Sequence, residues 1–379
     1  MTHSDPLLLT PGPLTTSAAV KAAMQHDWGS RDHEFIAMNQ RVCEQLVDLA
    51  HATSEHVCVP IQGSGTFAIE ATLGTLIPRT SKTLILVNGA YGRRMAKILS
   101  YHGRKQEILE TAEDVPVSAS AVDARLRADA DIGYVLAVHC ETTSGILNPI
   151  SDIAAIVSKH ARHFIIDAMS AFGALELDAR HVRFDALVAS SNKCLEGVPG
   201  LGFAIMRETL LADSAGNAPA LSLDLHDQWR AMQGNGQWRF TPPTHVLAAL
   251  DQALNEHREE GGVAGRHARY AHNCRILIDG MRELGFETLL SDAVQAPIIV
   301  TFRMPSDPRF DFQAFYDRLA AQGFVIYPGK LTVAPSFRIG CIGHLNAHDM
   351  RAALRCIGST LKELGLEQCG ASSQQVVNL

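Results

Sequence analysis

The sequence predicts an α/β fold, in which a large domain holds a mainly parallel, mixed β-sheet flanked by helices and a smaller α+β domain follows it. From about residue 57 onward, short apolar runs alternate with longer helical patterns, as expected when helices connect parallel strands. These runs are continuously apolar, which is typical of strands buried on both faces. A chain of 379 residues is also long enough for two domains.

The expected elements of the large domain follow from residue type and spacing. Strands are predicted where apolar runs end near Gly, Asn, Asp or Ser, at residues 57–61, 83–87, 134–138, 164–167, 186–190 and 202–206. Helices are predicted where apolar residues recur at three- and four-residue spacing, at residues 34–51, 67–77, 92–102, 150–160 and 244–260. Between 213 and 236 the pattern loosens, and we expect an irregular excursion at the edge of the domain.

The C-terminal part of the chain has a different pattern, which begins with a long predicted helix at residues 265–284. Strands are then expected at 296–302, 324–327 and 336–340, and helices at 311–322 and 349–364. We therefore predict a large domain at residues 20–264. Residues 1–19 and 265–379 are predicted to form an N-terminal arm and a small C-terminal domain.

Composition excludes several classes of function. Hydrophobic residues make up 46% of the chain and charged residues 19%, as in a well-packed soluble protein. The net charge of −7 arises from 33 basic and 40 acidic residues with no block of like charge, so we expect no nucleic-acid partner and no membrane partner. The sequence has no secretory signal and no long apolar run, which predicts a cytoplasmic protein.

Cysteine and histidine patterns give no sign of a metal site. The eight cysteines are scattered without Cys-x-x-Cys pairs, and we expect them to be reduced and mostly buried. The 17 histidines include no His-Glu-x-x-His pattern, so no metal is predicted.

Three short motifs carry candidate chemistry. The first is Gln62-Gly63-Ser64-Gly65-Thr66, which follows a predicted strand and opens a helix, where free backbone N–H groups can bind a phosphate. The second is Asp167, which ends a predicted strand and would point into the crevice where α/β sheets bind ligands. The third is Lys193, which follows the next strand. Each motif has a plain alternative, namely a tight turn, a helix cap and a surface cation.

Together, the three motifs supply what pyridoxal phosphate needs. The lysine amine can form a Schiff base with the aldehyde of this cofactor. The carboxylate can keep the pyridine nitrogen protonated, so that the ring accepts electrons when a substrate carbon loses a proton. The glycine turn can hold the phosphate. Pyridoxal 5′-phosphate is therefore the predicted cofactor, and an enzyme is favoured over a binding or structural protein that merely uses the fold.

Longer motifs run from residue 9 to residue 340. They are Leu-Thr-Pro-Gly-Pro at 9–13, His-Cys-Glu-Thr-Thr-Ser-Gly-Ile-Leu-Asn-Pro at 139–149, Asp-Ala-Met-Ser at 167–170, Ser-Asn-Lys-Cys at 191–194, Trp-Arg-Phe-Thr-Pro-Pro-Thr-His at 238–245, Tyr-Pro-Gly-Lys at 327–330 and Phe-Arg-Ile-Gly at 337–340. With these motifs the chain resembles the class V aminotransferases, which have the fold of the fold-type I pyridoxal-phosphate-dependent transferases. Within that class it most resembles the 2-aminoethylphosphonate:pyruvate aminotransferases.

The resemblance implies a ping-pong transamination of phosphonate catabolism. In this reaction 2-aminoethylphosphonate gives its amino group to pyruvate, and the products are phosphonoacetaldehyde and alanine. Lys193 would be the Schiff-base lysine and would also shuttle a proton, while Asp167 would pair with the pyridine nitrogen. The residues implied to bind the cofactor phosphate are Ser64, Gly65 and Thr66, with Thr241 reaching it from the neighbouring subunit. A homodimer with shared active sites is therefore expected.

Further contacts with the cofactor and the substrate follow from the same resemblance. Tyr91 would stack on the pyridine ring, although ordinary buried packing is the alternative. The other implied polar contacts to the cofactor or substrate are Thr142, Thr143 and Asn192. For the substrate anion, a guanidinium suits both a carboxylate and a phosphonate. The implied substrate-binding residues are Arg338, Trp28 and Arg31, of which the last two lie on an early segment near the active-site mouth; for Arg31 a surface position is the alternative.

Two other reactions remain open at this stage. An alanine or serine:glyoxylate aminotransferase would share the phosphate turn, the aspartate and the lysine. The pair Thr142-Thr143 and the Ser-Asn-Lys-Cys motif favour the phosphonate enzyme over it. A cysteine desulfurase would need an exposed thiol of low pKa at Cys194 or Cys341. Cys194 directly follows the lysine, and we expect it to be a buried packing residue.

Overall fold

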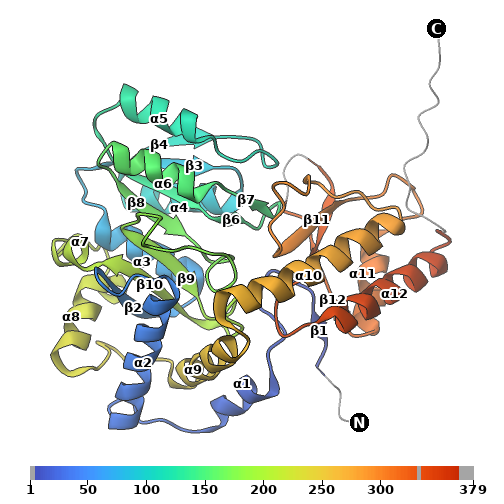
Figure 1. Ribbon diagram of the computed structural model, residues 1–379, viewed down its shortest axis with the longest axis horizontal. Helices are drawn as coiled ribbons and strands as arrows, with labels where there is room; N and C mark the ends of the chain where they lie inside the picture. The colour runs from blue at the N-terminus through green and yellow to red at the C-terminus, as the bar shows by residue number, and fades with distance from the viewer. Residues whose placement is uncertain (1–4, 331–333, 367–379) are drawn as a thin grey trace.

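The computed structural model describes residues 5–330 and 334–366 and contains a central seven-stranded β-sheet (Figure 1). In spatial order its strands are β2 (His56–Gly63), β10 (Gly200–Arg207), β9 (Ala186–Ser190), β8 (His163–Asp167), β5 (Ile132–Val138), β3 (Lys82–Val87) and β4 (Lys105–Glu110). Within this sheet, β10 runs antiparallel to both of its neighbours, and every other pair is parallel. The predicted mixed, mainly parallel sheet is therefore confirmed.

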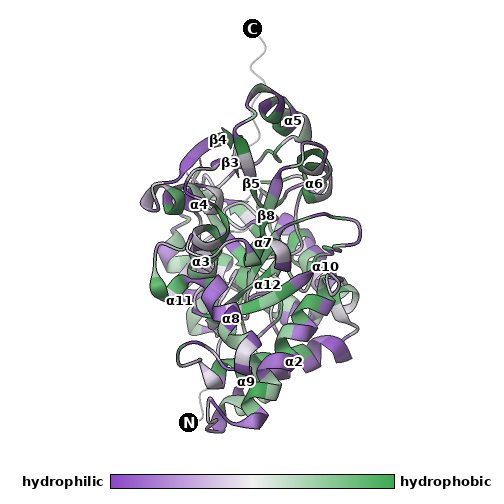
Figure 2. Ribbon diagram, turned by 90° about the vertical axis from the view of Figure 1, so that its left-hand side faces the viewer, coloured by the Kyte–Doolittle hydropathy of each residue, from purple (hydrophilic) through white to green (hydrophobic). Residues whose placement is uncertain are grey.

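Helices cover both faces of the sheet, because its strands are apolar on both sides. One core combines residues of α2 (His33–Leu49), α5 (Ala119–Ala128), α6 (Ile150–Lys159) and α9 (Thr244–Glu259). The other combines residues of α3 (Gly65–Leu76), α4 (Ala90–Tyr101) and α8 (Leu225–Asn235). Neighbouring residues of β3 alternate between them, since Ile85 lies in the second core and Leu86 in the first. The helix α2 has hydrophobic and hydrophilic sides, as Figure 2 shows.

Three of the longer elements of the large domain differ from the sequence prediction. Neither β4 nor α5 was predicted. β4 was missed because it is the edge strand of the sheet and its polar residues are partly exposed. The helix α8 lies in the stretch that was expected to be irregular. It begins after Asp224, whose carboxylate accepts a hydrogen bond from the backbone of Asp227, and it ends at Gly236 with φ of 74°. Few of its residues are buried, so its apolar periodicity is weak.

The C-terminal region forms a second, smaller α+β unit. Its elements are α10 (Gly262–Glu283), β11 (Ile299–Arg303), α11 (Phe312–Ala321), β12 (Phe324–Val325), β13 (Tyr327–Pro328), β14 (Ser336–Gly340) and α12 (Ala347–Glu363). The predicted single strand at 324–327 is wrong, because β13 pairs with β14 whereas β12 pairs with β1 (Leu7–Leu8) near the N-terminus. The predicted strand at 296–302 corresponds to β11, which starts and ends later.

The apolar core of this unit includes Leu9 from the N-terminal arm, together with residues of α10, β11, α11, β14 and α12. That core supports a division of the chain into residues 20–264 and residues 1–19 plus 265–379, whose boundaries remain a prediction. The parts of these ranges at 1–4, 331–333 and 367–379 lie outside the described residues.

Short elements complete the described chain. They are α1 (Ala18–Ala22), η1 (Ala23–Gln25), β6 (Cys140–Glu141), β7 (Ile146–Leu147), α7 (Glu208–Ala212) and η2 (Leu221–Leu223). No helix among the described residues is long and apolar enough to cross a membrane. The seven cysteines in this part of the chain are free thiols, and all except Cys43 are buried.

Candidate active site

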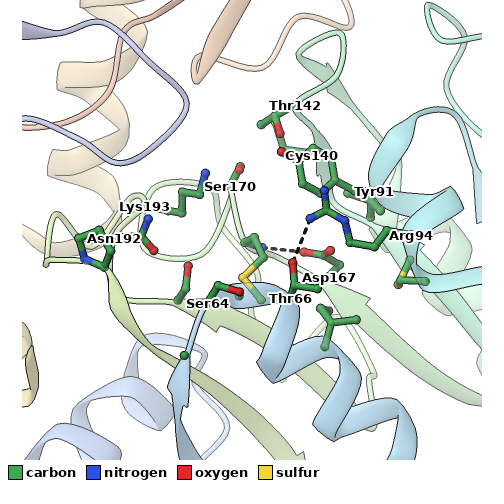
Figure 3. Close-up of a pocket in the computed structure, with 18 of the residues that line it drawn as sticks. Ser64, Thr66, Tyr91, Arg94, Cys140, Thr142, Asp167, Ser170, Asn192 and Lys193 are labelled. Carbon is green, nitrogen blue, oxygen red and sulfur yellow. Dashed lines mark hydrogen bonds between the residues drawn. The ribbon is translucent and has the colours of Figure 1, made fainter. Parts of the chain in front are cut away.

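The parallel strands β5, β8 and β9 end at one edge of the sheet, and a cavity of about 440 Å³ lies there (Figure 3). The chain enters β10 from the same edge, because β10 is antiparallel to β9. Eight of the residues proposed from the sequence line this cavity, namely Ser64, Gly65, Thr66, Tyr91, Thr142, Asp167, Asn192 and Lys193. Sheet topology therefore brings together groups that are far apart in the sequence.

The glycine turn forms the floor of the cavity at the start of α3. Ser64 is the N-cap residue of this helix, but its hydroxyl makes no capping hydrogen bond. The first turn of α3 contains no acidic side chain, so the backbone N–H groups at the positive end of the helix can bind an anion in the cavity. A Cβ added at Gly65 would lie 2.5 Å from Sδ of Met169, so a larger residue here would require the Met169 side chain to move. This arrangement fits a phosphate group.

Lys193 reaches into the cavity from the loop between β9 and β10. Its Nζ donates a hydrogen bond to the carbonyl oxygen of Pro11 at 2.5 Å. A Cβ added at Gly12 would come within 2.7 Å of the same Nζ, so the N-terminal arm packs directly on the amine. Burial lowers the pKa of the Lys193 amine from its usual value, although the charges of nearby Tyr91 and Asp167 oppose this effect. A lysine of this kind can be neutral and nucleophilic.

Asp167 is the last residue of β8 and is 5% exposed. Its Oδ1 accepts a hydrogen bond from the backbone N–H of Met169 at 3.0 Å (Figure 3). Burial raises the pKa of this carboxyl group to about 6, whereas the charges of Arg94 and Lys193 act in the opposite direction. A cationic ligand group beside Asp167 would keep the carboxylate ionised.

Arg94 also lines the cavity, and the sequence reasoning missed it. Its Nη1 donates to the hydroxyl of Thr66 at 3.0 Å, and its Cζ lies 4.8 Å from the centre of the Tyr91 ring (Figure 3). Arg94 follows Tyr91 by three residues on α4, so both side chains lie on the same face of this helix. With Tyr91 assigned to the site, the three-residue spacing on a helix would have predicted that Arg94 lies there too. Cys140 and Ser170 line the cavity too.

Thr143 does not line the cavity but lies behind it, next to the buried Glu141. The Thr143 hydroxyl donates to Oε1 of Glu141 at 2.5 Å and accepts the backbone N–H of Ala90 at 2.9 Å. Glu141 also accepts the backbone N–H of Tyr91 at 3.1 Å. Burial raises the pKa of the Glu141 carboxyl group, and these hydrogen bonds lower it. Glu141 and Thr143 thus hold the N-terminus of α4, from which Tyr91 projects.

Arg338 lies on β14 and is 2% exposed. It donates from Nη1 to the carbonyl oxygen of Thr142 at 2.8 Å and from Nε to that of Pro328 at 3.1 Å. Burial lowers the pKa of its guanidinium, which faces the charges of Tyr91, Tyr327 and Glu141. Arg338 therefore sits directly behind a residue of the cavity wall.

Besides Thr143 and Arg338, which lie behind the cavity wall, three of the proposed residues lie away from the cavity in this chain. Thr241 is exposed and lines a separate hollow of about 210 Å³ that also contains Gln62 and Phe240. Trp28 packs against the edge of the large core, and Arg31 is exposed. The segments that carry these residues are neighbours, because His245 lies 3.2 Å from Asp27.

Cys194, next to the lysine, is fully buried, and burial raises the pKa of its thiol to about 12. Cys341 is also fully buried, and its thiol pKa is likewise raised by burial. Neither residue has the exposed, low-pKa thiol that a persulfide carrier needs. The geometry thus argues against a desulfurase.

Known proteins resemble this chain over almost all of its length. Residues 15–358 match the family described as class-V aminotransferases. The chain belongs to the class V aminotransferase family. This aminotransferase is 54% identical to a 2-aminoethylphosphonate:pyruvate transaminase of Pseudomonas fluorescens, over 96% of the present chain and 99% of that relative. It is 53% identical to the protein of that name from Pseudomonas aeruginosa, over 95% and 97% of the two chains.

A solved structure extends the comparison to the fold. The pyridoxamine:pyruvate aminotransferase of Mesorhizobium loti is 26% identical, and the match covers 97% of this aminotransferase and 95% of that chain with a TM-score of 0.89. The fold-type I transferase architecture expected from the sequence is therefore confirmed.

Proposed function

We propose that this aminotransferase moves the amino group of 2-aminoethylphosphonate to pyruvate and so forms phosphonoacetaldehyde and alanine. The observation that carries the proposal is the 54% identity, over nearly the full length, to a relative named for this reaction. The cavity that joins Lys193, Asp167 and a phosphate-sized turn supports it. The reaction is a ping-pong transamination of phosphonate catabolism, in which one site serves both substrates in turn.

The cofactor is pyridoxal 5′-phosphate, and the residues of the cavity fit it. The glycine turn offers the backbone N–H groups at the start of α3, and Asp167 is a buried carboxylate that accepts the backbone N–H of Met169. The residues that would hold the cofactor are Ser64, Gly65 and Thr66 at the phosphate, Asp167 at the pyridine nitrogen, Tyr91 on the ring face, and Thr142 and Asn192 at its polar edge. Thr143 lies behind the cavity and would act only through Glu141 and the start of α4. When bound, the cofactor supplies an electron sink for the bond that breaks at the substrate carbon. Arg94 adds a positive charge beside Thr66.

Lys193 performs the proton transfer. Because burial lowers the pKa of its amine, Lys193 can accept the proton that leaves the amine-bearing carbon of the substrate. The protonated amine of Lys193 would then act as a general acid and give this proton to the cofactor. The hydrogen bond to the carbonyl oxygen of Pro11 orients the amine while it carries that proton. Asp167 stays ionised and keeps the positive charge of the ring nitrogen in place.

Substrate anions are bound by guanidinium groups. Arg338 uses Nε and Nη1 for carbonyl oxygens, which leaves its Nη2 outside these two bonds. A planar guanidinium can donate hydrogen bonds to the tetrahedral phosphonate in the first half-reaction and to the carboxylate of pyruvate in the second. Trp28 and Arg31 complete the substrate site from the early segment.

The active form is a homodimer with shared active sites, located in the cytoplasm. Of the large apolar side chains that are exposed, Phe67 (51% exposed) lies beside the phosphate turn and Phe240 (45% exposed) lies beside Thr241. Leu221, in the same hollow as Phe240, is 68% exposed. A second copy that brings Thr241 to the phosphate turn of its partner would cover these side chains and shield the cofactor phosphate from water.

A half-reaction test separates the proposed reaction from its rivals. The purified holoenzyme is mixed with 2-aminoethylphosphonate alone, and the visible absorbance of the bound cofactor is followed. We expect the absorbance to change within one turnover, and pyruvate to restore it. The proposal fails if the absorbance stays constant with this substrate while serine or alanine with glyoxylate turns over. Alkylation of accessible thiols, which leaves Cys194 untouched, should not reduce the rate.

A further inference from the structure

A cluster of buried charges lies behind the catalytic lysine and has no part in the chemistry described above. Arg266, near the start of α10, is 1% exposed. Its Nη1 donates to the carbonyl oxygen of Cys194 at 2.5 Å. That carbonyl belongs to the residue that directly follows Lys193 in the chain. A guanidinium from the second unit of the fold therefore binds the backbone of the loop that carries Lys193 (residues 191–199), called the lysine loop below.

Glu196, three residues after Lys193, is the second member of the cluster. Its carboxylate is 3% exposed and accepts the hydroxyl of Tyr270 at 2.5 Å and Nη2 of Arg269 at 2.7 Å, and it lies 3.6 Å from Nη1 of Arg266. The backbone of Glu196 has φ of 62°, a left-handed conformation that is unfavourable for a residue with a Cβ. Glycine would adopt it without strain, so the carboxylate is the reason for glutamate at this position.

The charges of the cluster balance one another. Glu260 accepts Nε of Arg266 and Nε of Arg269, each at 2.6 Å, so that two guanidinium groups face two carboxylates. Buried charges cost desolvation free energy, and apolar packing would often be at least as stable. An ion cluster at this place is therefore better explained by the geometry it imposes than by stability alone.

The same cluster also binds the segment that follows β14. Arg269 donates from Nη1 to the carbonyl oxygen of Gly343 at 2.5 Å and to that of Leu345 at 2.9 Å. The backbone N–H of Gly343 donates to the hydroxyl of Tyr270 at 3.2 Å. Gly343 follows β14, the strand that carries Arg338. One connected set of hydrogen bonds thus joins the lysine loop to the segment after the proposed anion-binding strand.

We propose that Arg266 and Glu196 are positioning residues for Lys193, which fix the backbone on either side of Cys194 and so hold the reacting amine in register with the substrate anion site. Neither residue touches the cavity, and both act through the loop. This inference rests on the proposed function, because it assumes that Lys193 transfers the proton. It also gives the carbonyl oxygen of Cys194 a role that the buried thiol does not have.

Three variants test this inference in the holoenzyme. Arg266→Lys keeps a positive charge but loses the guanidinium fork. Glu196→Gln keeps the shape and one acceptor oxygen but removes the negative charge. Arg275→Lys, at an exposed position of the same helix, is the matched control. The measurements are kcat and KM for 2-aminoethylphosphonate, the visible circular dichroism of the bound cofactor, and the midpoint of thermal unfolding.

For Arg266→Lys we expect kcat to fall about 10- to 100-fold, as for a displacement of the order of 1 Å at the reacting groups. KM should change by less than about threefold, because substrate contacts stay in place. The visible circular dichroism should change, since it reports the orientation of the cofactor relative to its lysine. Glu196→Gln should show the same changes to a smaller extent, and Arg275→Lys should match the unmodified enzyme in all three measurements.

The inference is overturned if both cluster variants keep wild-type kcat and visible circular dichroism, even when their unfolding midpoints fall. If Arg266→Lys does not fold, Glu196→Gln decides the question by itself. Failure of the proposed function looks different. In that case the unmodified holoenzyme does not convert 2-aminoethylphosphonate and pyruvate, while the circular dichroism of the two variants still reports whether the cluster positions Lys193.

Discussion

Lys193 and Thr241 are both proposed to act on one cofactor, yet their surroundings in a single chain are opposite. Lys193 faces a cavity that strand ends and the N-terminal arm enclose. Thr241 is exposed on the surface, next to the exposed Phe240. Sheet topology within one chain places Lys193 at the cavity, whereas the proposed role of Thr241 requires a second copy.

Replacement of the lysine should have the largest effect. Lys193→Ala removes the amine that transfers the proton, and we expect kcat to fall at least about a thousandfold, within the range known for general acid–base groups. The protein should still bind the cofactor, but without a covalent bond to it. Steady-state rates and the visible absorbance spectrum check both statements. Activity within tenfold of the unmodified enzyme would contradict the assigned role.

Asp167→Asn should have the next largest effect. The amide cannot keep a positive charge on the ring nitrogen, so we expect kcat to fall about 100- to 1000-fold, within the range known for groups that control protonation in a reaction. The cavity should keep its shape, because Asn can still accept the backbone N–H of Met169. The measurement is kcat at saturating substrate. An unchanged kcat would show that Asp167 is only a structural residue.

The effect of Asp167→Asn on the thermal stability of the cofactor-free protein should depend on pH. The pKa of Asp167 rises from 3.8 to about 6, so the folded state prefers the protonated carboxyl group. This preference costs no stability below about pH 4. The cost grows between about pH 4 and pH 6 and stays at about 3 kcal/mol at higher pH. Asp167→Asn should therefore raise the thermal midpoint of the cofactor-free protein at pH 8 but not near pH 4. Equal shifts at both pH values would contradict this origin.

Thr241 allows a direct test of the shared site. Thr241→Glu places a negative charge at the phosphate, and we expect activity to fall about 10- to 100-fold. Mixing this variant with Lys193→Ala and re-forming the dimers should restore activity above either variant alone, because one site of each hybrid then has both native residues. Unmixed samples at equal total concentration are the control. No gain on mixing would mean that Thr241 does not act across subunits.

Arg31→Ala should have the smallest effect. The side chain is exposed, and exposed charges interact weakly in water. We expect KM for 2-aminoethylphosphonate to rise about threefold with kcat unchanged, which is the pattern for loss of uniform binding. Added salt should shrink the difference by screening. A loss in kcat instead would place Arg31 closer to the reacting groups than its position in one chain indicates.

Residues at strand ends could be predicted from the sequence for a physical reason. Apolar runs mark buried strands, and parallel strands end at one edge, so Asp167 and Lys193 were expected to meet. The loosely patterned helix α8 and the polar edge strand β4 could not be found in this way, since little of either is buried. Tertiary contacts decided these elements.

Residues that act through other residues could not be predicted from the sequence. Glu141 stood in a quoted motif, but its contacts with Tyr91 and Thr143 depend on how β6 meets the start of α4. Sequence patterns of one chain do not show that Phe67 and Phe240 are exposed, and in the proposed dimer a second copy would cover them. Sequence reasoning is strongest where a single sheet makes the geometry.

The antiparallel course of β10 has a consequence for protein engineering. The loop at 191–199 leaves β9 and re-enters the sheet at the same edge, and Ser191 bonds to the backbone of Leu201 at both its N–H and its hydroxyl. Lys193 is therefore carried on a closed loop whose two ends are tied together. An insertion in this loop would shift the amine directly. A redesign for new substrates should vary the walls of the cavity and leave the length of this loop unchanged.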